Sequence, residues 1–286
     1  QDAVAKLGVA GYNDECRAIV QRYVKEWRHT VTRIGRWLDF DDDYKTMDTW
    51  YMESVWWVFK QLWDKGLIYE GVTVMPVSTA LGTSLSNFEA TSNYMDVQDP
   101  AITVLFKLAD EDAYLAAWTT TPWTLPSNLA ICVGADIEYA LVKDSVSGRN
   151  LYIAADRLLA YDEMEEIHRV KGSDLVGKTY EPLFRYFADQ VTEGGFVVVS
   201  DAYVTTDSGT GIVHQAPAFG EDDYRVLRAH DIAAFACPVT MQGVFTDEVA
   251  DFAGQYVKDA DKEIIKHLKD SGALFRQETM QHSYPY

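Results

Sequence analysis

The chain has 286 residues, of which 48% are hydrophobic and 13% aromatic, so it can bury the core of one large domain or two small ones. Its 44 acidic and 25 basic residues give a formal net charge of −19, which excludes a protein that holds nucleic acid through a broadly basic surface. The sequence has no apolar run near the ~20 residues that span a bilayer and no secretion signal, so neither membrane insertion nor secretion is expected.

The first stretch, residues 1–98, is predicted to be helical. Asn13 suits an N-cap, and the apolar residues after it recur at helical spacing: Cys16, Ile19, Val20, Tyr23, Val24, Trp27 and Val31. A second stripe follows at Tyr51, Val55, Val58, Phe59, Leu62 and Trp63, and Gly66 suits the left-handed end of that helix. We expect two amphipathic helices, with the aromatic stripe of the second in a core.

The middle stretch, residues 99–257, changes to short β-rich runs separated by turns. These runs are 102–108, 114–121, 130–133, 139–142, 151–154, 196–199 and 211–215. Many short strands predict a barrel or a tight sandwich. We therefore expect an α+β protein with a β-barrel-like core, peripheral helices and a helical N-terminal segment.

The last stretch, residues 258–286, begins with a predicted helix over about Lys258 to Asp270, with Gly272 after it. A polar tail completes the sequence. Because the chain begins with Gln1 and ends at Tyr286 without an obvious domain end, we interpret it as an insertion excised from a larger protein, whose tail returns to the parent domain.

One motif concentrates hydroxyls between tryptophans and prolines: Trp118-Thr119-Thr120-Thr121-Pro122-Trp123-Thr124-Leu125-Pro126-Ser127-Asn128. Three consecutive threonines suit a strand end, because their β-branched side chains are stiff, and Pro122 biases Thr121 away from helix. Thr119 and Thr121 would point the same way if the strand continued. By itself such a cluster is more often structural than functional, by about three to one.

A second motif is Gly209-Thr210-Gly211-Ile212-Val213-His214-Gln215-Ala216-Pro217-Ala218-Phe219-Gly220-Glu221-Asp222-Asp223. The β-rich runs 197–200 and 203–206 and a turn at 207–209 come before it, so we expect a hairpin that delivers His214 on a strand. Asp222 and Asp223 fall at the start of a helix predicted over 224–230, where carboxylates suit the positive end of the helix dipole. Capping alone would explain these two residues.

Together the two motifs resemble the editing domain, connective peptide 1, that is inserted in the class I aminoacyl-tRNA synthetases for isoleucine, valine and leucine. The form Thr119-Thr120-Thr121-Pro122-Trp123 resembles the isoleucyl enzyme, whereas valyl and leucyl relatives have Thr-Thr-Arg-Pro there and Lys or Met in place of His214. Segments such as 34–37, 52–62 and 85–89 extend the resemblance to the eukaryotic cytosolic isoleucyl type over nearly the whole chain.

The resemblance implies a role for each site residue. Thr119, Thr120, Thr121 and Asp223 are the expected catalytic residues, and Asn128 is expected beside the threonines near the reaction centre and the terminal adenosine. Asp223 is expected to bind the α-ammonium of the amino acid, a charge-assisted contact. His214 is expected to close the side-chain pocket, and Trp123 to contribute to substrate binding.

The implied reaction is hydrolysis of the ester in valyl-tRNA made on the isoleucine tRNA, and of valyl-adenylate as a further substrate. A pocket that admits isoleucine also admits valine, because one methylene changes binding by only ~1 to 3 kcal/mol, so a second, smaller pocket must remove the error; aminoacyl-tRNA synthetases are the standard illustration of this rule. An aminoacyl ester is already activated, so a positioned water and oxyanion stabilisation suffice.

We expect no cofactor and no metal. The sequence has no His-x-x-x-His pair, and Cys16, Cys132 and Cys237 form no Cys-x-x-Cys pair, which is against both a zinc site and a disulfide framework. The expected partners are a tRNA 3′-terminal adenosine carrying valine and the remainder of the parent synthetase, which would hold the tRNA despite the acidity of this chain. The expected location is the cytoplasm.

Two alternatives remain open. The first is a covalent hydrolase in which one of the three threonines is activated by His214. The second is a docking module for the tRNA 3′ end without catalytic activity. The chain lacks the His-Ile-Gly-His and Lys-Met-Ser-Lys-Ser signatures of the family, so it is not expected to charge tRNA by itself.

Overall fold

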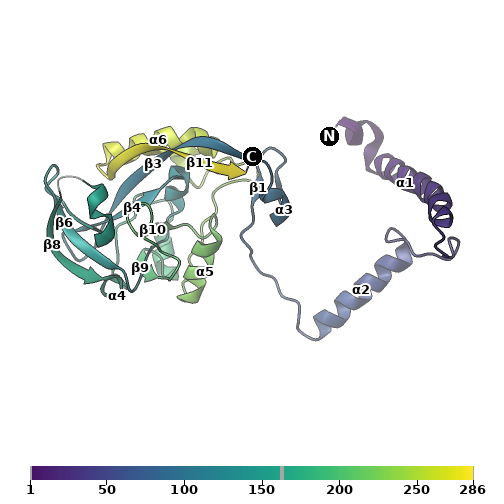
Figure 1. The fold of residues 1–286 in the computed structure, drawn as a ribbon, viewed down its shortest axis with the longest axis horizontal. Coiled ribbons are helices and arrows are strands. Elements are labelled where there is room, and N and C mark those ends of the chain that lie inside the picture. The colour runs from purple at the N-terminus through teal and green to yellow at the C-terminus, as the bar shows by residue number, and fades with distance from the viewer. Residues whose placement is uncertain (1, 162–163, 286) are drawn as a thin grey trace. The chain divides into compact units, whose positions relative to one another are not determined.

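The computed structural model describes residues 2–161 and 164–285, and the chain divides into two compact units, Gln1–Gly71 and Val72–Tyr286 (Figure 1). The first unit contains two helices, α1 (Asp2–Arg33) and α2 (Thr49–Asp64), and the second contains the strands and the remaining helices. The predicted boundaries at residues 98 and 257 stay a prediction.

Helix α1 begins earlier than predicted. Asn13 lies inside it, and the helical path is interrupted instead at Gly8, which has φ 71° and ψ 164°. The prediction of an N-cap at Asn13 is wrong because the preceding residues are themselves compatible with helix, so nothing there forces a start. At the other end of α2, Gly66 adopts φ 68° and donates its N–H to the Trp63 carbonyl, which confirms the predicted helix end.

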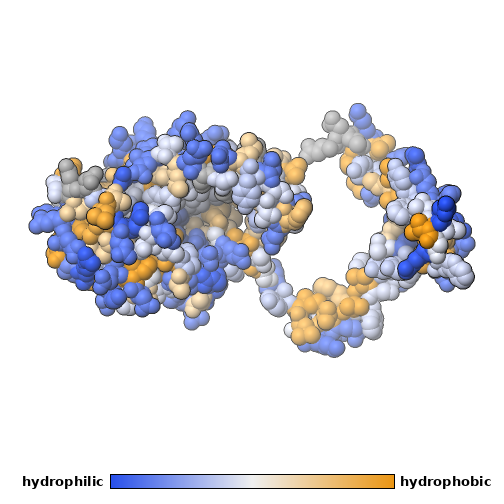
Figure 2. Space-filling view, in the orientation of Figure 1, coloured by the Kyte–Doolittle hydropathy of each residue, from blue (hydrophilic) through white to orange (hydrophobic). Residues whose placement is uncertain are grey.

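The aromatic stripe of α2 is not in a core. None of the residues of α2 is buried, and Figure 2 shows hydrophobic residues gathered along this helix. The prediction is wrong for this unit because two helices without a sheet or further helices provide no second layer to cover an apolar face. No helix of the described residues is long and apolar enough to cross a membrane.

The larger sheet of the second unit has six strands in the order β11-β3-β4-β7-β6-β8. Their bounds are β3 (Tyr94–Lys107), β4 (Tyr114–Thr119), β6 (Glu138–Asp144), β7 (Asn150–Ala154), β8 (Met164–Lys171) and β11 (Leu274–Pro285). Strands β4 and β7 are parallel, and the other neighbours are antiparallel. Ile102, Val104 and Phe106 pack into one core and Leu105 into another, so this sheet is covered on both faces.

The smaller sheet has three strands in the order β10-β5-β9, namely β5 (Ala130–Val133), β9 (Val197–Ser200) and β10 (Ile212–Gln215). Strand β5 is antiparallel to β10 and parallel to β9. The predicted hairpin before His214 is therefore wrong: β9 and β10 lie on opposite sides of β5, and 203–206 is a loop. Burial of β5 on every side favours pairing on both of its edges, and sequence runs alone do not reveal that order.

Helices and short turns complete the second unit. They are α3 (Asn87–Ala90), α4 (Gly172–Leu175), α5 (Glu221–Ala229) and α6 (Val257–Asp270), the 3₁₀ turns η1 (Pro122–Ser127), η2 (Ala155–Ala160), η3 (Ala188–Glu193) and η4 (Ala250–Phe252), and the two-residue strands β1 (Val77–Ser78) and β2 (Thr83–Ser84). Helix α6 lies where the sequence predicts a helix. The polar tail that follows is strand β11, paired with β3 along its length.

The α+β class, the many short strands and the peripheral helices are confirmed. The strands form separate sheets, and among the described strands no pairing joins the outer edges of the six-stranded sheet, β11 and β8, into a closed barrel. Strand β4 of the large sheet and β10 of the small sheet are neighbours in space, which brings the two sequence motifs together.

Candidate active site

The threonine motif forms a tight turn between strand and helix. Strand β4 ends at Thr119, and Pro122 begins η1, so Thr120 and Thr121 connect the two. The Thr121 N–H donates to Thr119 Oγ1 at 3.1 Å, and the hydroxyl oxygens of Thr119 and Thr121 are 3.2 Å apart. The strand does not continue to Thr121 as supposed, but the turn still places these two hydroxyls side by side.

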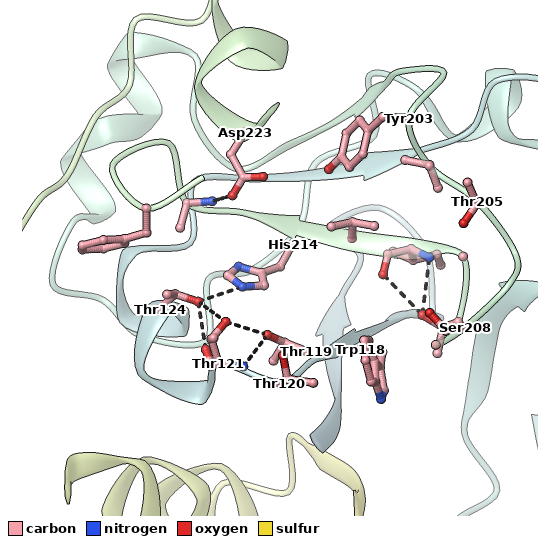
Figure 3. Close-up of a pocket in the computed structure, with 18 residues that line it drawn as sticks. Trp118, Thr119, Thr120, Thr121, Thr124, Tyr203, Thr205, Ser208, His214 and Asp223 are labelled. Carbon is pink, nitrogen blue, oxygen red and sulfur yellow. Dashed lines mark hydrogen bonds between the residues drawn. The ribbon is translucent and has the colours of Figure 1, made fainter. Parts of the chain in front are cut away.

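Thr124 extends this group by one turn of η1. Its hydroxyl donates to the Thr121 carbonyl at 2.9 Å and lies 3.0 Å from His214 Nε2. Which of the two groups donates in the Thr124–His214 contact depends on the tautomer of the ring. Figure 3 shows the hydroxyls of Thr119, Thr121 and Thr124 gathered on the side toward which the His214 ring points.

His214 is 7% exposed and lies on β10, paired in register with Ile131 of β5. Burial lowers the pKa of its imidazole to about 4, so the ring is neutral at pH 7. Its Nδ1 atom has no hydrogen-bond partner among the described residues. The buried ring is therefore held by one hydrogen bond and is a weak base.

Asp223 lies in the first turn of α5, and its Oδ2 accepts the Ala216 N–H at 2.8 Å. Burial raises the pKa of its carboxyl to about 6, and the charge of Asp222 adds to this, yet the group remains mostly ionised at pH 7. Gly220 leaves room for this carboxylate, because a Cβ at that position would lie 2.7 Å from Asp223 Cγ. Asp223 is thus a half-buried negative charge rather than a simple helix cap.

One cavity of about 370 Å³ joins these groups, a size typical of small-molecule sites. Of the residues predicted from sequence, Thr119, Thr120, Thr121, His214 and Asp223 line it. Lining residues to which the sequence assigned no role include Trp118, Thr124, Tyr203, Thr205, Ser208 and Phe219. Thr124 could have been found by its spacing, since three residues after Thr121 is one turn of a 3₁₀ helix.

Two predicted residues lie outside the cavity lining. Asn128 is buried, accepts the Tyr180 hydroxyl at 2.7 Å and donates to the Ala130 carbonyl at 2.9 Å. Trp123 packs its ring edge-to-face on Phe219, with the ring centres 4.9 Å apart. Trp123 supports the cavity wall through Phe219, whereas neither hydrogen-bond partner of Asn128 lines the cavity. The prediction that the two residues contact substrate stays a prediction.

Glycines shape the far end of the cavity. Gly209 and Gly211 adopt φ 64° and 73°, and a Cβ on Gly209 would lie 3.1 Å from Trp118. Side chains at these positions would force the loop away from the cavity. No group of three or more side chains that could hold a metal ion occurs among the described residues.

Comparison with known proteins places this chain in a family. The family described as tRNA synthetases class I (I, L, M and V) matches residues 1–197. The chain is 56% identical over 289 residues to the isoleucine-tRNA ligase of Bdellovibrio bacteriovorus, with 99% of this chain and 27% of that protein covered. It is 55% identical over 292 residues to the cytoplasmic isoleucine-tRNA ligase of Mus musculus, with 99% and 23% covered. The chain thus spans about a quarter of the length of these relatives.

Among solved structures, the cytosolic leucyl-tRNA synthetase editing domain of P. knowlesi matches with a TM-score of 0.50. The match covers 70% of this chain and all of that one (100%), at 9% sequence identity. At this identity the likeness concerns the fold alone.

Proposed function

Because the chain belongs to the class I tRNA synthetases, we propose that its cavity is the editing site of an isoleucyl-tRNA synthetase and hydrolyses valyl-tRNA made on the isoleucine tRNA. The observation that supports this most is the convergence of a threonine turn, a neutral buried histidine and an ionised carboxylate on one cavity. Valyl-adenylate is a second proposed substrate of the same site.

The threonine turn supplies the polar groups for hydrolysis. Water adds to the ester carbonyl, and the carbonyl oxygen takes up negative charge. The tetrahedral intermediate then collapses and breaks the bond to the ribose oxygen. The ribose oxygen leaves as a hydroxyl, with the proton that the attacking water gives up. Hydroxyls held as a group at Thr119 and Thr121 can orient the water and donate to the oxyanion without reorganising. No strong nucleophile is needed for an ester that is already activated.

Asp223 recognises the amino acid through its α-ammonium in this proposal. The carboxylate is already partly neutralised by one backbone donor, and an ammonium would compensate the remaining unfavourable burial of charge. An N-acetylated aminoacyl ester lacks this charge and should be a poor substrate.

His214 supplies discrimination by size. Held by Thr124 and buried on β10, the ring cannot move aside without losing its hydrogen bond. A stiff wall rejects the extra methylene of isoleucine, because overpacking costs about 1 to 3 kcal/mol.

The partners and location belong to the same proposal. Because this chain is acidic and repels RNA, the remainder of the parent synthetase binds the tRNA body in this proposal. The cavity receives only the aminoacylated 3′ end. Eukaryotic relatives are named as cytoplasmic proteins, which supports a cytoplasmic location.

The test measures deacylation of valyl-tRNA and isoleucyl-tRNA, both charged on the isoleucine tRNA, side by side. We expect hydrolysis of the valyl ester only, and its loss in Asp223→Ala by a factor of 30 or more, corresponding to ~2 to 4 kcal/mol for an unpaired charge. Asp222→Ala is the matched control, because Asp222 is exposed, bonds Arg225 and does not line the cavity. No hydrolysis by the wild type at high concentration would favour the docking module.

The covalent alternative has one observation in its favour, the contact between Thr124 and His214. The low pKa of His214 opposes it, because a weak base activates a hydroxyl poorly. Rapid acid quenching with labelled valyl ester decides the matter: labelled protein would support a covalent intermediate, and we expect none.

A further inference from the structure

The start of η1 has one backbone donor that the turn itself does not satisfy. Pro122 has no N–H, and the Thr124 N–H donates to the Thr121 carbonyl at 3.1 Å, which leaves the Trp123 N–H. Thr121 occupies the N-cap position, and threonine there commonly accepts such a donor through its side chain. In this turn the Thr121 side chain makes no cap hydrogen bond.

The donor is satisfied from another element. Asp261, on α6, accepts the Trp123 N–H at 2.9 Å although the two residues are 138 positions apart in sequence. Asp261 is only 4% exposed, and α6 packs against η1. Its charged neighbours are Lys258 and Asp99, which pair with each other at 2.8 Å.

We propose that Asp261 is a positioning residue of the editing site, which caps η1 in place of Thr121 and thereby leaves the Thr121 hydroxyl to the cavity. The inference rests on the proposed function and adds a residue outside the cavity lining to it. An acceptor brought by α6 satisfies the turn, so the Thr121 hydroxyl stays 3.2 Å from Thr119 Oγ1 and 3.4 Å from Thr124 Oγ1.

Without Asp261, the Trp123 N–H and the site would compete for the Thr121 hydroxyl. With Asp261→Ala the Trp123 N–H is buried without a partner, and an unpaired buried donor is unfavourable by about 1 to 3 kcal/mol. Thr121 is at the N-cap, and a threonine there can accept the amide two positions on after rotation about χ1. That rotation withdraws one hydroxyl from the site.

The first experiment compares Asp261→Ala, Asp261→Asn and Asp259→Ala in hydrolysis of valyl-tRNA. We expect Asp261→Ala to lower kcat about tenfold with little change in KM, since misplacing one catalytic group affects the chemical step more than binding. Asp261→Asn retains an acceptor oxygen and should stay within about threefold of the wild type. Asp259 is exposed on the same helix and serves as the matched control.

The second experiment separates positioning from general loss of structure by combining Asp261→Ala with Thr121→Val. Without a hydroxyl at residue 121 there is nothing to withdraw, so Asp261→Ala should lower kcat no further in the double variant. Multiplicative effects of the two substitutions would overturn the proposal.

A readout without substrate keeps this inference distinct from the proposed function. A crystal structure of Asp261→Ala should show Thr121 Oγ1 within hydrogen-bond distance of the Trp123 nitrogen. If the wild type hydrolyses no ester, the proposed function is wrong, but the crystal structure still tests the capping inference. An unchanged Thr121 side chain overturns the capping inference whatever the activity.

Discussion

At the scale of single residues, the site depends on two side chains whose burial moves their pKa values in useful directions. The pKa of His214 is about 4, so the ring is neutral at pH 7, and the pKa of Asp223 is about 6, so its carboxyl is mostly ionised there. Burial disfavours the charged form of both, which lowers the pKa of a base and raises that of an acid. In the proposed reaction the neutral His214 ring limits the size of the substrate side chain, and the Asp223 carboxylate, which already accepts the Ala216 N–H, gains an ionic partner when an ammonium binds.

Replacing His214 tests the wall directly. We expect His214→Ala to gain hydrolysis of correctly charged isoleucyl-tRNA, by about tenfold to a hundredfold, and to retain most valyl-tRNA hydrolysis. His214→Phe keeps the bulk without the nitrogens and should still reject isoleucine. Loss of both activities in the two variants would instead make the imidazole part of the chemistry.

The pH dependence of kcat/KM tests Asp223. The carboxylate must be ionised to bind an ammonium, so activity toward valyl-tRNA should fall as the pH decreases through about 6. A base at His214 would place the fall near pH 4 instead. Steady-state rates between pH 5 and 7.5 distinguish the two, with His214→Phe expected to keep the fall near pH 6.

At the scale of elements, the threonine turn is where a strand and a 3₁₀ helix meet. Strand β4 ends at Thr119 and η1 begins at Pro122, and each fixes one side of the turn, so the hydroxyls are ordered by backbone geometry rather than by substrate. Backbone order of this kind limits the entropy lost when a water and an ester bind.

Because the Thr119 and Thr121 hydroxyls are in contact, we expect the effects of replacing them on the rate of hydrolysis to be non-additive. Thr119→Val and Thr121→Val should each slow hydrolysis about tenfold, and the double variant should fall short of the product because the two groups are in contact. Thr120 also lines the cavity, so Thr120→Val belongs to the same series of variants. If one single variant lost hydrolysis as completely as the double variant, the residue at that position would be a nucleophile.

At the scale of the whole molecule, the cavity belongs entirely to the second unit. Its lining residues fall between Trp118 and Asp223, and α6, which supports η1, follows within the same unit. We expect a fragment of residues 72–286 to unfold cooperatively at the same temperature as the full chain and to hydrolyse valyl-tRNA within about threefold of it. Calorimetry and the deacylation assay check this, and a fragment that does not fold would contradict it.

The free energy of unfolding should depend on pH because Asp223 is a partly buried carboxylate. Its pKa is raised from 3.8 to about 6 on folding, so the carboxylate adds no penalty below pH 4, and stability is lost as the pH rises from about 4 to 6. Asp223→Asn should therefore be more stable than the wild type at pH 7 by about 2 to 3 kcal/mol, and equally stable at pH 4. Denaturant titrations at both pH values measure this, and a destabilised variant at pH 7 would contradict the assigned burial.

The sequence by itself determined the class of fold, most strand positions and some of the residues that line the cavity. Hydrophobic periodicity and β-branched runs report local structure, so 130–133 and the helix near 258–270 were predicted almost to the residue. The two motifs identified Thr119, Thr121, His214 and Asp223 because their spacing resembles one family of sites.

Only the tertiary structure decided the rest. Strand order is set by which edges can be buried together, so the insertion of β5 between β9 and β10 replaced the expected hairpin. The same holds for Thr124 and Asp261, whose roles depend on contacts with His214 and Trp123 across 90 and 138 positions of sequence. Such contacts leave no periodic signal, because a hydrogen bond between distant elements is fixed by packing rather than by local propensity.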